Sequence, residues 1–192
     1  MGFVEQVEEL GMRAFTINDA SRILGKNKEY TRLVMHRLLR RGLIRRLGNG
    51  RYYTKHATIY EIASGIVYPC YVSAMAAANY YNLTTQIPIE ADVVILKRHK
   101  AAEALGTRIR FITTSRKRFF GFHKEQQGIF MADIEKALVD MVYFRIAENE
   151  ADEIFKNAYR LKQIDVHKLS KYANTMASKK VNRIVGKWIA GG

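Results

Sequence analysis

The amino-acid sequence predicts an α+β fold in two parts, and three patterns along the chain indicate it. Two short helical patterns and a hairpin pattern follow one another over residues 15–53. Short runs rich in Ile, Val, Phe and Thr between residues 92 and 131 indicate a small mixed sheet. Beyond residue 133, apolar residues recur at helical spacing. We therefore expect an N-terminal domain of helices and a hairpin over residues 1–60, followed by a mixed sheet-and-helix C-terminal domain over residues 61–192.

Two helices separated by a tight turn are expected first. Residues 17–24 form the first helix, and either Asn18 or Asp19 can cap it by accepting free backbone N–H groups. Gly25 follows, where a helix end favours the left-handed conformation. The second helix is expected from about residue 27 to residue 41. Four of its residues recur at helical spacing and predict a buried face, namely Thr31, Val34, Met35 and Leu38.

A hairpin is expected after the second helix. Gly42 ends that helix, and Leu43 and Ile44 begin a strand. The tip Gly48-Asn49-Gly50 suits the positive φ angles of tight hairpin turns, and two tyrosines return as the second strand. Helix, turn, basic helix and hairpin is the order of a winged helix-turn-helix, a module that usually binds duplex DNA. We therefore expect residues 1–60 to be such a module.

Clustered cations favour a nucleic-acid partner. The chain has a formal net charge of +14, and residues 1–60 hold 12 Lys and Arg against 5 Asp and Glu. Such clusters gain affinity for a duplex by releasing its condensed counterions. Helix phase predicts Lys28, Arg32 and His36 near base edges, and the hairpin cations near phosphates or in the minor groove. The predicted DNA contacts are Lys26, Asn27, Lys28, Arg32, His36, Arg37, Arg40, Arg45, Arg46 and Arg51.

The second part alternates breaks with regular patterns. Residues 55–64 are expected to be a linker or a short helix, and Pro69 predicts an extended segment before it. Ser73 and Asp133 are each expected to cap a helix; the first helix ends near Leu83. The second helix is amphipathic, with an apolar stripe of Ile134, Ala137, Leu138, Met141 and Val142. Strands are expected at residues 92–96, 108–113, 118–123 and 128–131, and further helices at 152–161, 165–172 and 178–189.

Residues 97–124 form a second basic zone, with nine Lys or Arg and Glu103 as the one acid. Five of its cations are candidate auxiliary contacts to flanking DNA phosphates or to RNA, namely Arg108, Arg110, Arg116, Lys117 and Arg118. The other interpretation is a solvated strand face, and for the cations the two stay open. For the interleaved Phe119, Phe120 and Phe122, a place in the core is favoured over a surface that stacks on bases.

The sequence does not favour an enzyme or a metalloprotein. Its five histidines are scattered, so we expect neither a metal site nor a cofactor. Asp133, Glu135 and Asp140 lie close together, but a helix cap and a polar flank explain them better than catalysis. The single cysteine, Cys70, is expected to be a buried, inert thiol. An acidic N-terminus, and no apolar run near the roughly 18 residues of a membrane helix, predict a soluble cytoplasmic protein.

Three blocks in the same order resemble AbiEi-type antitoxins. The first is the winged helix-turn-helix pattern; the second runs from PCYVSAMAAA, which begins at Pro69, to YYNLTTQIP, which ends at Pro88. The third is IEKALVD, residues 134–140, and the likeness covers residues 10–145. The resemblance implies a repressor that binds an inverted repeat upstream of its own toxin–antitoxin operon. It also implies a nucleotidyltransferase-like toxin and an antitoxin activity in the C-terminal domain.

Two functions of different classes are therefore weighed against each other. The first is a sequence-specific DNA-binding repressor, of which two copies are expected on a palindromic operator because one winged helix reads few base pairs. The alternative is a protein-interaction module that binds and silences a partner protein, with DNA binding secondary and the cations a solvated face. A toxin gene transcribed together with this one would favour the antitoxin role.

Overall fold

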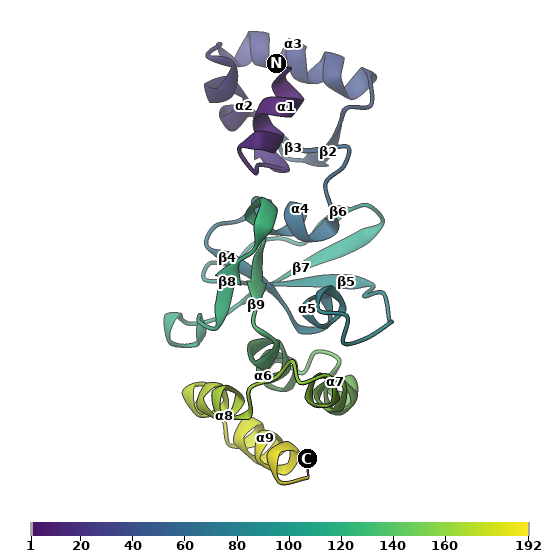
Figure 1. Cartoon of the computed structure of the whole chain (residues 1–192). Coiled ribbons are helices and arrows are strands. Elements are labelled where there is room, and N and C mark those ends of the chain that lie inside the picture. Colours follow the sequence, from purple (N-terminus) through teal and green to yellow (C-terminus); the bar gives the residue numbers. More distant parts are fainter. Residues whose placement is uncertain (1, 192) are drawn as a thin grey trace.

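The computed structural model describes residues 2–191 and confirms the α+β class. The elements form three layers along one axis, with N-terminal helices and a small sheet at one end, a larger sheet in the middle and helices at the other end (Figure 1). The N-terminal layer contains α1 (Phe3–Glu9), β1 (Ala14–Thr16), α2 (Ile17–Leu24), α3 (Lys28–Arg40), β2 (Ile44–Gly48) and β3 (Arg51–Thr54).

The middle layer contains α4 (Ile59–Ile66), β4 (Cys70–Ser73), α5 (Ala74–Tyr80), β5 (Glu90–Ile95), β6 (Ala102–Ala104), β7 (Thr107–Thr113), the 3-10 turn η1 (Arg116–Arg118), β8 (Phe122–Lys124), the 3-10 turn η2 (Gln126–Gly128) and β9 (Phe130–Ala132). The C-terminal layer contains α6 (Ile134–Phe144), α7 (Glu148–Arg160), α8 (Val166–Thr175) and α9 (Lys179–Gly191).

The helices predicted for the N-terminal layer are present, but α2 starts differently. It spans the predicted residues and ends at Gly25, whose φ of 60° is left-handed. Thr16 occupies the cap instead of Asn18 or Asp19, and the side chains of Thr16 and Asp19 bond reciprocally to each other's backbone N–H. Thr16 takes this position because β1 delivers it in the extended conformation that a cap residue needs.

The small sheet has the order β1-β3-β2, and both pairs are antiparallel. The sequence does not predict β1, since three residues become a strand only through pairing, here with β3. At the predicted hairpin tip, Gly48, Asn49 and Gly50 all have positive φ, as the turn requires. A core joins this sheet to the three helices and includes Phe3, Val7, Phe15, Ala20, Met35, Ile44 and Tyr52.

The middle sheet has the order β6-β7-β5-β4-β9-β8 and is mixed, as predicted. β5 is parallel to β7 and antiparallel to β4, and β4 is parallel to β9. The strand predicted at residues 118–123 is present as β8, but it begins only at Phe122. The chain turns through η1 and becomes extended only at β8, because Gly121 has a left-handed φ of 73° just before that strand.

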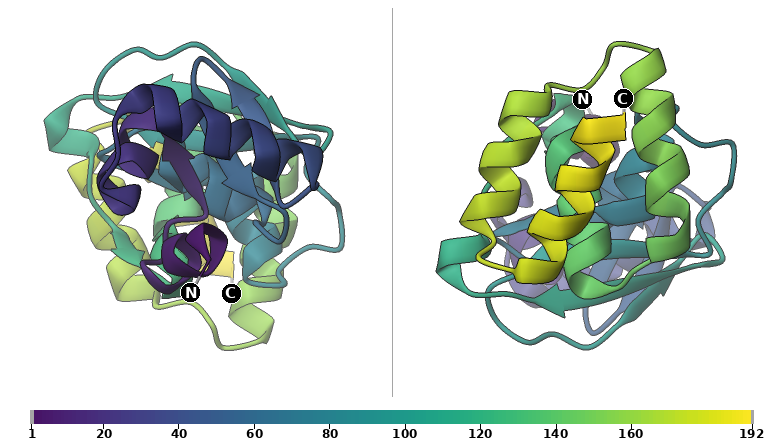
Figure 2. Two further views of the ribbon diagram at one scale, coloured as in Figure 1. Left: turned by 90° about the horizontal axis from the view of Figure 1, so that it is seen from above. Right: turned by 90° about the horizontal axis from the view of Figure 1, so that it is seen from below.

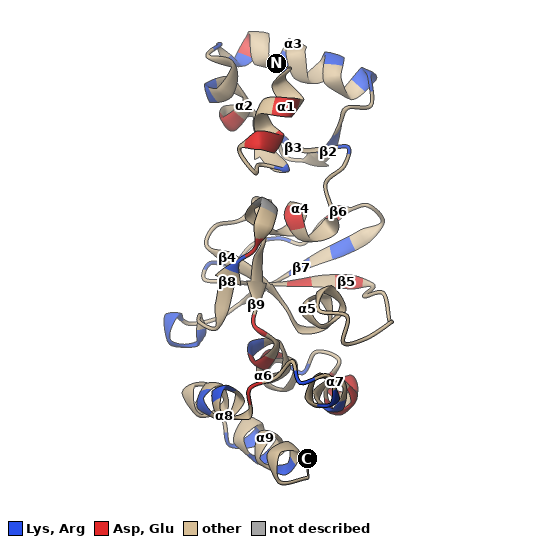
Figure 3. Cartoon of the chain, viewed as in Figure 1, with Lys and Arg blue, Asp and Glu red and all other residues tan. Residues whose placement is uncertain are grey.

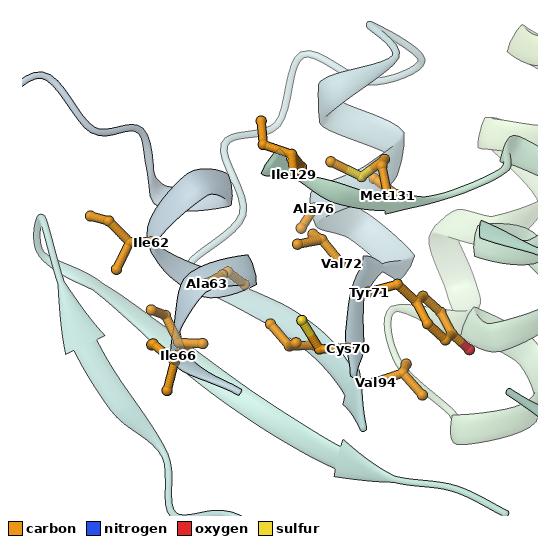
Figure 4. Close-up of a cluster of buried hydrophobic side chains, with 14 of the residues drawn as sticks. Ile62, Ala63, Ile66, Cys70, Tyr71, Val72, Ala76, Val94, Ile129 and Met131 are labelled. Carbon is orange, nitrogen blue, oxygen red and sulfur yellow. The ribbon is translucent and has the colours of Figure 1, made fainter. Parts of the chain in front are cut away.

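The main core lies between this sheet and the helices α4 and α5 (Figure 4). Residues 55–64, predicted as a linker or a short helix, contribute most of α4. This helix approaches β1 closely, since a Cβ atom at Gly65 would lie 2.7 Å from Cβ of Ala14. Only glycine allows that approach. Tyr71 turns its hydroxyl away from this core toward the C-terminal helices (Figure 4).

An ionic contact also joins the N-terminal and middle layers. Glu61 is buried in the first turn of α4, where its Oε2 accepts a hydrogen bond from the backbone N–H of Thr58 (2.6 Å). Its Oε1 lies 3.2 Å from Nε of Arg13, which also pairs with Glu8 at the end of α1. Charge and close packing thus attach the N-terminal layer to α4.

Helices α7, α8 and α9 pack on α6 at the other end of the molecule (Figure 2). The two capping predictions for the second part are correct in position but not in hydrogen bonding. Ser73 and Asp133 occupy the cap positions of α5 and α6, but neither side chain bonds to the backbone of its helix. The Ser73 hydroxyl donates to Asp140 (2.8 Å), and Asp133 accepts from the Tyr172 hydroxyl (2.7 Å). Partners distant in sequence have replaced the local ones.

Candidate nucleic-acid interface

Helix α3 crosses the outer end of the molecule, and no other described element covers its outer side (Figures 1 and 2). Asn27 starts the helix, since its Oδ1 accepts a hydrogen bond from the backbone N–H of Tyr30 (2.9 Å). Gly25 reverses the chain before it, and the fully buried Ala20 leaves room for α2 and α3 to pack together. The local sequence therefore both begins α3 and sets its place at the end of the molecule.

One face of α3 is buried, as predicted. Thr31 and Met35 have 0% and 1% exposure, and Val34 and Leu38 are half-buried. The predicted contact residues on and before this helix are all exposed, namely Lys26, Asn27, Lys28, Arg32, His36, Arg37 and Arg40. Within residues 2–191, none of the Lys and Arg in that set takes part in an ion pair. Their charge is available to an anionic partner.

The hairpin of β2 and β3 adds cations on the side of α3 that faces the middle layer (Figure 3). Arg45 and Arg46 on β2 are exposed, and Arg51 on β3 is half-buried. Leu47 packs against the main core, and β2 contacts the edge strand β6 of the middle sheet. The hairpin is therefore a supported cationic surface and not a free arm.

The centre of the exposed face of α3 is a leucine. At 3.6 residues per turn, Leu33 lies about 200° round the helix from both Thr31 and Met35. Its side chain is 59% exposed, although it is fully apolar. Glu29 and Arg37 lie one turn before and one turn after it, and both are exposed. A line of Glu29, Leu33 and Arg37 thus faces outward.

Lys28 and Arg32 lie off this central line. Each comes three residues before a buried residue, Thr31 or Met35, so each borders the buried face. The sequence interpretation placed them near base edges and did not include Leu33. An exposed leucine in a basic helix is easily taken for a core residue; its two-residue offset from both Thr31 and Met35 is the signal that identifies its position.

The basic zone at residues 97–124 is divided by the fold. Arg108 and Arg110 at the start of β7 face acids of the neighbouring parallel strand β5. Nε of Arg110 lies 2.7 Å from Oδ1 of Asp92, and both arginines also pair with Glu90. The parallel register therefore neutralises part of this charge within the sheet.

The cations of η1 differ among themselves. Nε of Arg118 donates to the backbone oxygen of Met176 (3.1 Å), and its guanidinium lies 5.1 Å from the ring centre of Tyr143. Arg116 and Lys117 are exposed. Of the five predicted auxiliary contacts, three thus have partners within the chain, and two face solvent in the middle layer, away from α3.

The phenylalanines of the same zone belong to the core, as the sequence favoured. Phe119 and Phe122 lie against Tyr71, with ring centroids 5.2 and 4.7 Å away, and Phe120 lies against Tyr172. All three phenylalanines are half-buried. Phe119 and Phe120 reach the core from the segment between η1 and β8, and only Phe122 lies on a strand, so alternation along one strand does not place all three.

The prediction that Glu135 and Asp140 form a polar flank is wrong, since both residues are buried. Asp140 belongs to a buried charged cluster. Nζ of Lys136 lies 2.5 Å from Oδ1 of Asp140, and both side chains are fully inaccessible. Oδ2 of Asp140 accepts from the hydroxyls of Tyr71 (3.1 Å) and Ser73 (2.8 Å). Burial lowers the pKa of Lys136 and raises that of Asp140, while their mutual attraction opposes both shifts. The cluster joins β4 to α6 and is closed to solvent.

Cys70 is buried, as predicted. Burial raises the pKa of its thiol to about 12, which keeps it protonated at neutral pH. No three or more His, Cys, Asp or Glu side chains in the described part of the chain are arranged to hold a metal ion. Across the same residues, no helix combines the length and apolar character needed to cross a membrane.

His123 forms a polar cluster where β8 approaches α8. Its Nδ1 lies 2.8 Å from Oδ1 of Asp133, and its Nε2 lies 2.8 Å from Oε1 of Glu125. Nζ of Lys168 contacts Asp133 (3.0 Å) and Glu135 (3.1 Å). Partial burial lowers the pKa of His123, but the hydrogen bonds to the two carboxylates outweigh it, so its pKa lies above the ordinary value.

The cluster predicts a pH-dependent contribution to stability. A histidine with a raised pKa in the folded state stabilises fully below its unfolded pKa of about 6.5, and this contribution is lost as pH rises through the folded pKa. The free energy of unfolding should therefore fall with rising pH above about 6.5 more steeply in the natural protein than in His123→Gln. The difference should be modest, because the side chain is nearly half exposed. Urea unfolding of both proteins at a series of pH values measures it; parallel pH curves would contradict it.

Neither a protein-family model nor a curated protein sequence matches the chain. Its function is therefore inferred from the geometry and charge of α3 and the hairpin, together with the sequence resemblance described above.

Proposed function

We propose that the chain is a sequence-specific DNA-binding transcriptional repressor of the cytoplasm, with a winged helix-turn-helix in residues 1–60. One observation carries the proposal: an uncovered helix presents Lys and Arg that have no ion-pair partner within residues 2–191, beside a hairpin with exposed arginines. An α-helix with side chains is about 10–12 Å wide, and the major groove of B-DNA is about 12 Å wide. A duplex therefore offers both the shape and the negative charge that this surface fits.

We assign α3 to the major groove and the hairpin to the flanking backbone. Arg45 and Arg46 are successive residues of β2 and point to opposite faces of a hairpin that is braced against β6. They can therefore hold phosphates on its two sides without ordering a flexible arm. α3 has 13 residues and is about 20 Å long, and a helix of that length touches only a few base pairs. We therefore propose that two copies bind an inverted repeat, and a footprint over a single half-site would oppose this.

The test uses the full chain and a pool of random-sequence duplexes, from which bound DNA is recovered, amplified and sequenced. Affinity for the recovered duplex and for a scrambled duplex is then measured across a salt series. We expect tight binding to the recovered duplex alone, with log affinity falling linearly with log salt concentration. The double variant Arg45→Gln/Arg46→Gln should reduce the slope by about 1.8, because each lost phosphate contact removes about 0.9.

The matched control removes the same charge from the opposite end of the molecule. Arg183→Gln/Lys187→Gln changes two exposed cations of α9 and should leave the slope unchanged. Equal, weak and steeply salt-dependent binding to both duplexes would mean that the charge is generic. The protein-interaction alternative would then explain the exposed face of α3 better.

The antitoxin role is proposed on the AbiEi resemblance alone. It predicts a gene for a nucleotidyltransferase-like toxin beside this one, whose toxicity is relieved when this chain is co-expressed. The variant Arg45→Gln/Arg46→Gln should weaken repression but keep antitoxin activity, since the resemblance assigns antitoxin activity to the C-terminal domain. Full protection by that variant would support the assignment, and no protection by either protein would oppose the antitoxin role.

A further inference from the structure

The exposed face of α3 has an apolar centre and charged borders. Leu33 lies opposite the buried pair Thr31 and Met35, and 59% of its surface meets water. Lys28 and Arg32 border one side of this face, and Arg37 continues its central line. A cationic surface that only held phosphates would gain nothing from a leucine at the point of closest approach, because phosphate oxygens offer no apolar contact.

Base edges in the major groove do include one apolar group, the C5 methyl of thymine. A helix that enters the groove brings its outermost line closest to the base edges, and in α3 that line runs through Leu33. We infer that Leu33 reads a thymine methyl in the operator and is the specificity-determining residue of α3, while Lys28 and Arg32 hold backbone phosphates. The inference rests on the proposed DNA-binding function and names the base feature that the site recognises.

The neighbour one turn before Leu33 agrees with this orientation. Glu29 is exposed and lies on the same outward line. A carboxylate is repelled by phosphate oxygens, but it can accept a hydrogen bond from the N4 amino group of cytosine. The central line thus carries an acid and a leucine together with Arg37, while Lys28 and Arg32 lie beside it. Phosphates would favour neither the acid nor the leucine, whereas base edges can accept contacts from both.

The experiment removes one methyl group at a time from the DNA. In the duplex recovered from the random pool, each thymidine is replaced in turn by deoxyuridine, which lacks only the C5 methyl. For the natural protein, replacement at one position in each half-site should weaken binding about four-fold or more, the effect of a buried methyl-sized group. Leu33→Ala should weaken binding to the thymidine duplex by a similar factor and should be insensitive to deoxyuridine at that position.

Two control variants separate this effect from others. Leu161→Ala removes another exposed leucine, at the end of α7, and should change neither affinity nor methyl sensitivity. Arg32→Ala should weaken binding to the thymidine and deoxyuridine duplexes equally, because a phosphate contact carries no base information. Leu33→Ala is expected to unfold at the same urea concentration as the natural protein, since its side chain is mostly exposed.

The outcomes distinguish the inference from the function it rests on. If a specific duplex is recovered and Leu33→Ala keeps the full methyl sensitivity of the natural protein, the reading by Leu33 is overturned while DNA binding stands. If Arg32→Ala, and not Leu33→Ala, abolishes methyl sensitivity, the inference is overturned, and Arg32 faces the bases as the sequence predicts. If the pool yields no preferred duplex, both the inference and the proposed function fail.

Discussion

Asp140→Ala is expected to destabilise the protein by about 3–5 kcal/mol, the range for removing one partner of a buried ion pair. The carboxylate accepts hydrogen bonds from Lys136, Tyr71 and Ser73, and none of these groups is accessible to water. Its loss leaves a buried ammonium and two buried hydroxyls without their acceptor. Since small domains are stable by about 5–15 kcal/mol, this variant should lose a large share of its stability. The urea midpoint, followed by circular dichroism, measures the change.

Two further variants show whether burial is the cause. Lys136→Met/Asp140→Leu replaces the pair by apolar side chains of similar size. It should recover the part of the loss that comes from the unpaired ammonium, although the hydroxyls of Tyr71 and Ser73 still lack their acceptor. Glu148→Gln removes a partner from the ion pair with Lys180, in which both side chains are about one-third exposed. This control should cost about 1 kcal/mol or less. A loss in Asp140→Ala no larger than in Glu148→Gln would refute the argument.

Trp188→Ala is expected to destabilise the protein by about 3–5 kcal/mol, as large aromatic-to-alanine changes in cores do. The indole is 8% exposed and stacks on Phe155, with ring centroids 5.2 Å apart and an angle of 11° between the planes. Its Nε1–H donates to Oδ1 of Asp152, so the substitution also removes the donor to that carboxylate. These contacts attach α9 to α7 at the end of the molecule far from α3 (Figure 1). Unfolding is followed by circular dichroism, because the change removes the one tryptophan of the chain.

A matched aromatic residue in the same stack serves as the control. Tyr159 lies 5.9 Å from Phe155 but is 45% exposed, so Tyr159→Ala should cost much less than Trp188→Ala. Trp188→Phe keeps a stacked ring, loses the hydrogen bond and should fall between the two. Equal losses for Trp188→Ala and Tyr159→Ala would show that the indole is not the anchor of α9.

Patterns within a few residues of each other predicted the N-terminal layer well. Gly25 and the tip at residues 48–50 set local conformations that need no distant partner, so α2, α3 and the hairpin, but not α1, could be placed from the sequence. The three-residue strands β1 and β6 could not, because each exists only through its pairing with another strand. For the same reason the sequence predicts the cap position of Ser73 but not its partner, since its hydroxyl bonds to Asp140, 67 residues away.

The same difference between local patterns and distant contacts decides which parts of the candidate site could be predicted. The exposed cations of α3 and the hairpin could be predicted from composition and helical spacing. The predicted buried face also places Leu33 opposite Thr31 and Met35, but an apolar residue is not sought among DNA contacts. Pairing of Arg108 and Arg110 with acids on β5 depends on a parallel register that no local pattern encodes. Burial of Lys136 and Asp140 depends on Tyr71 and β4. An amphipathic pattern assigns charged residues to solvent by default, which is why the sequence predicts a polar flank at Glu135 and Asp140.

Glu61 serves two structural tasks at once, because one oxygen starts α4 and the other faces Arg13 of the N-terminal layer. Tilting that layer would leave the buried Glu61 carboxylate without Arg13 and would separate Gly65 from Ala14. The layer therefore has no free hinge at this point. The direction in which α3 points is then fixed relative to the six-stranded sheet. If two copies bind DNA as proposed, the distance between their α3 helices follows from where the copies touch, and that contact would set which half-site spacing is recognised.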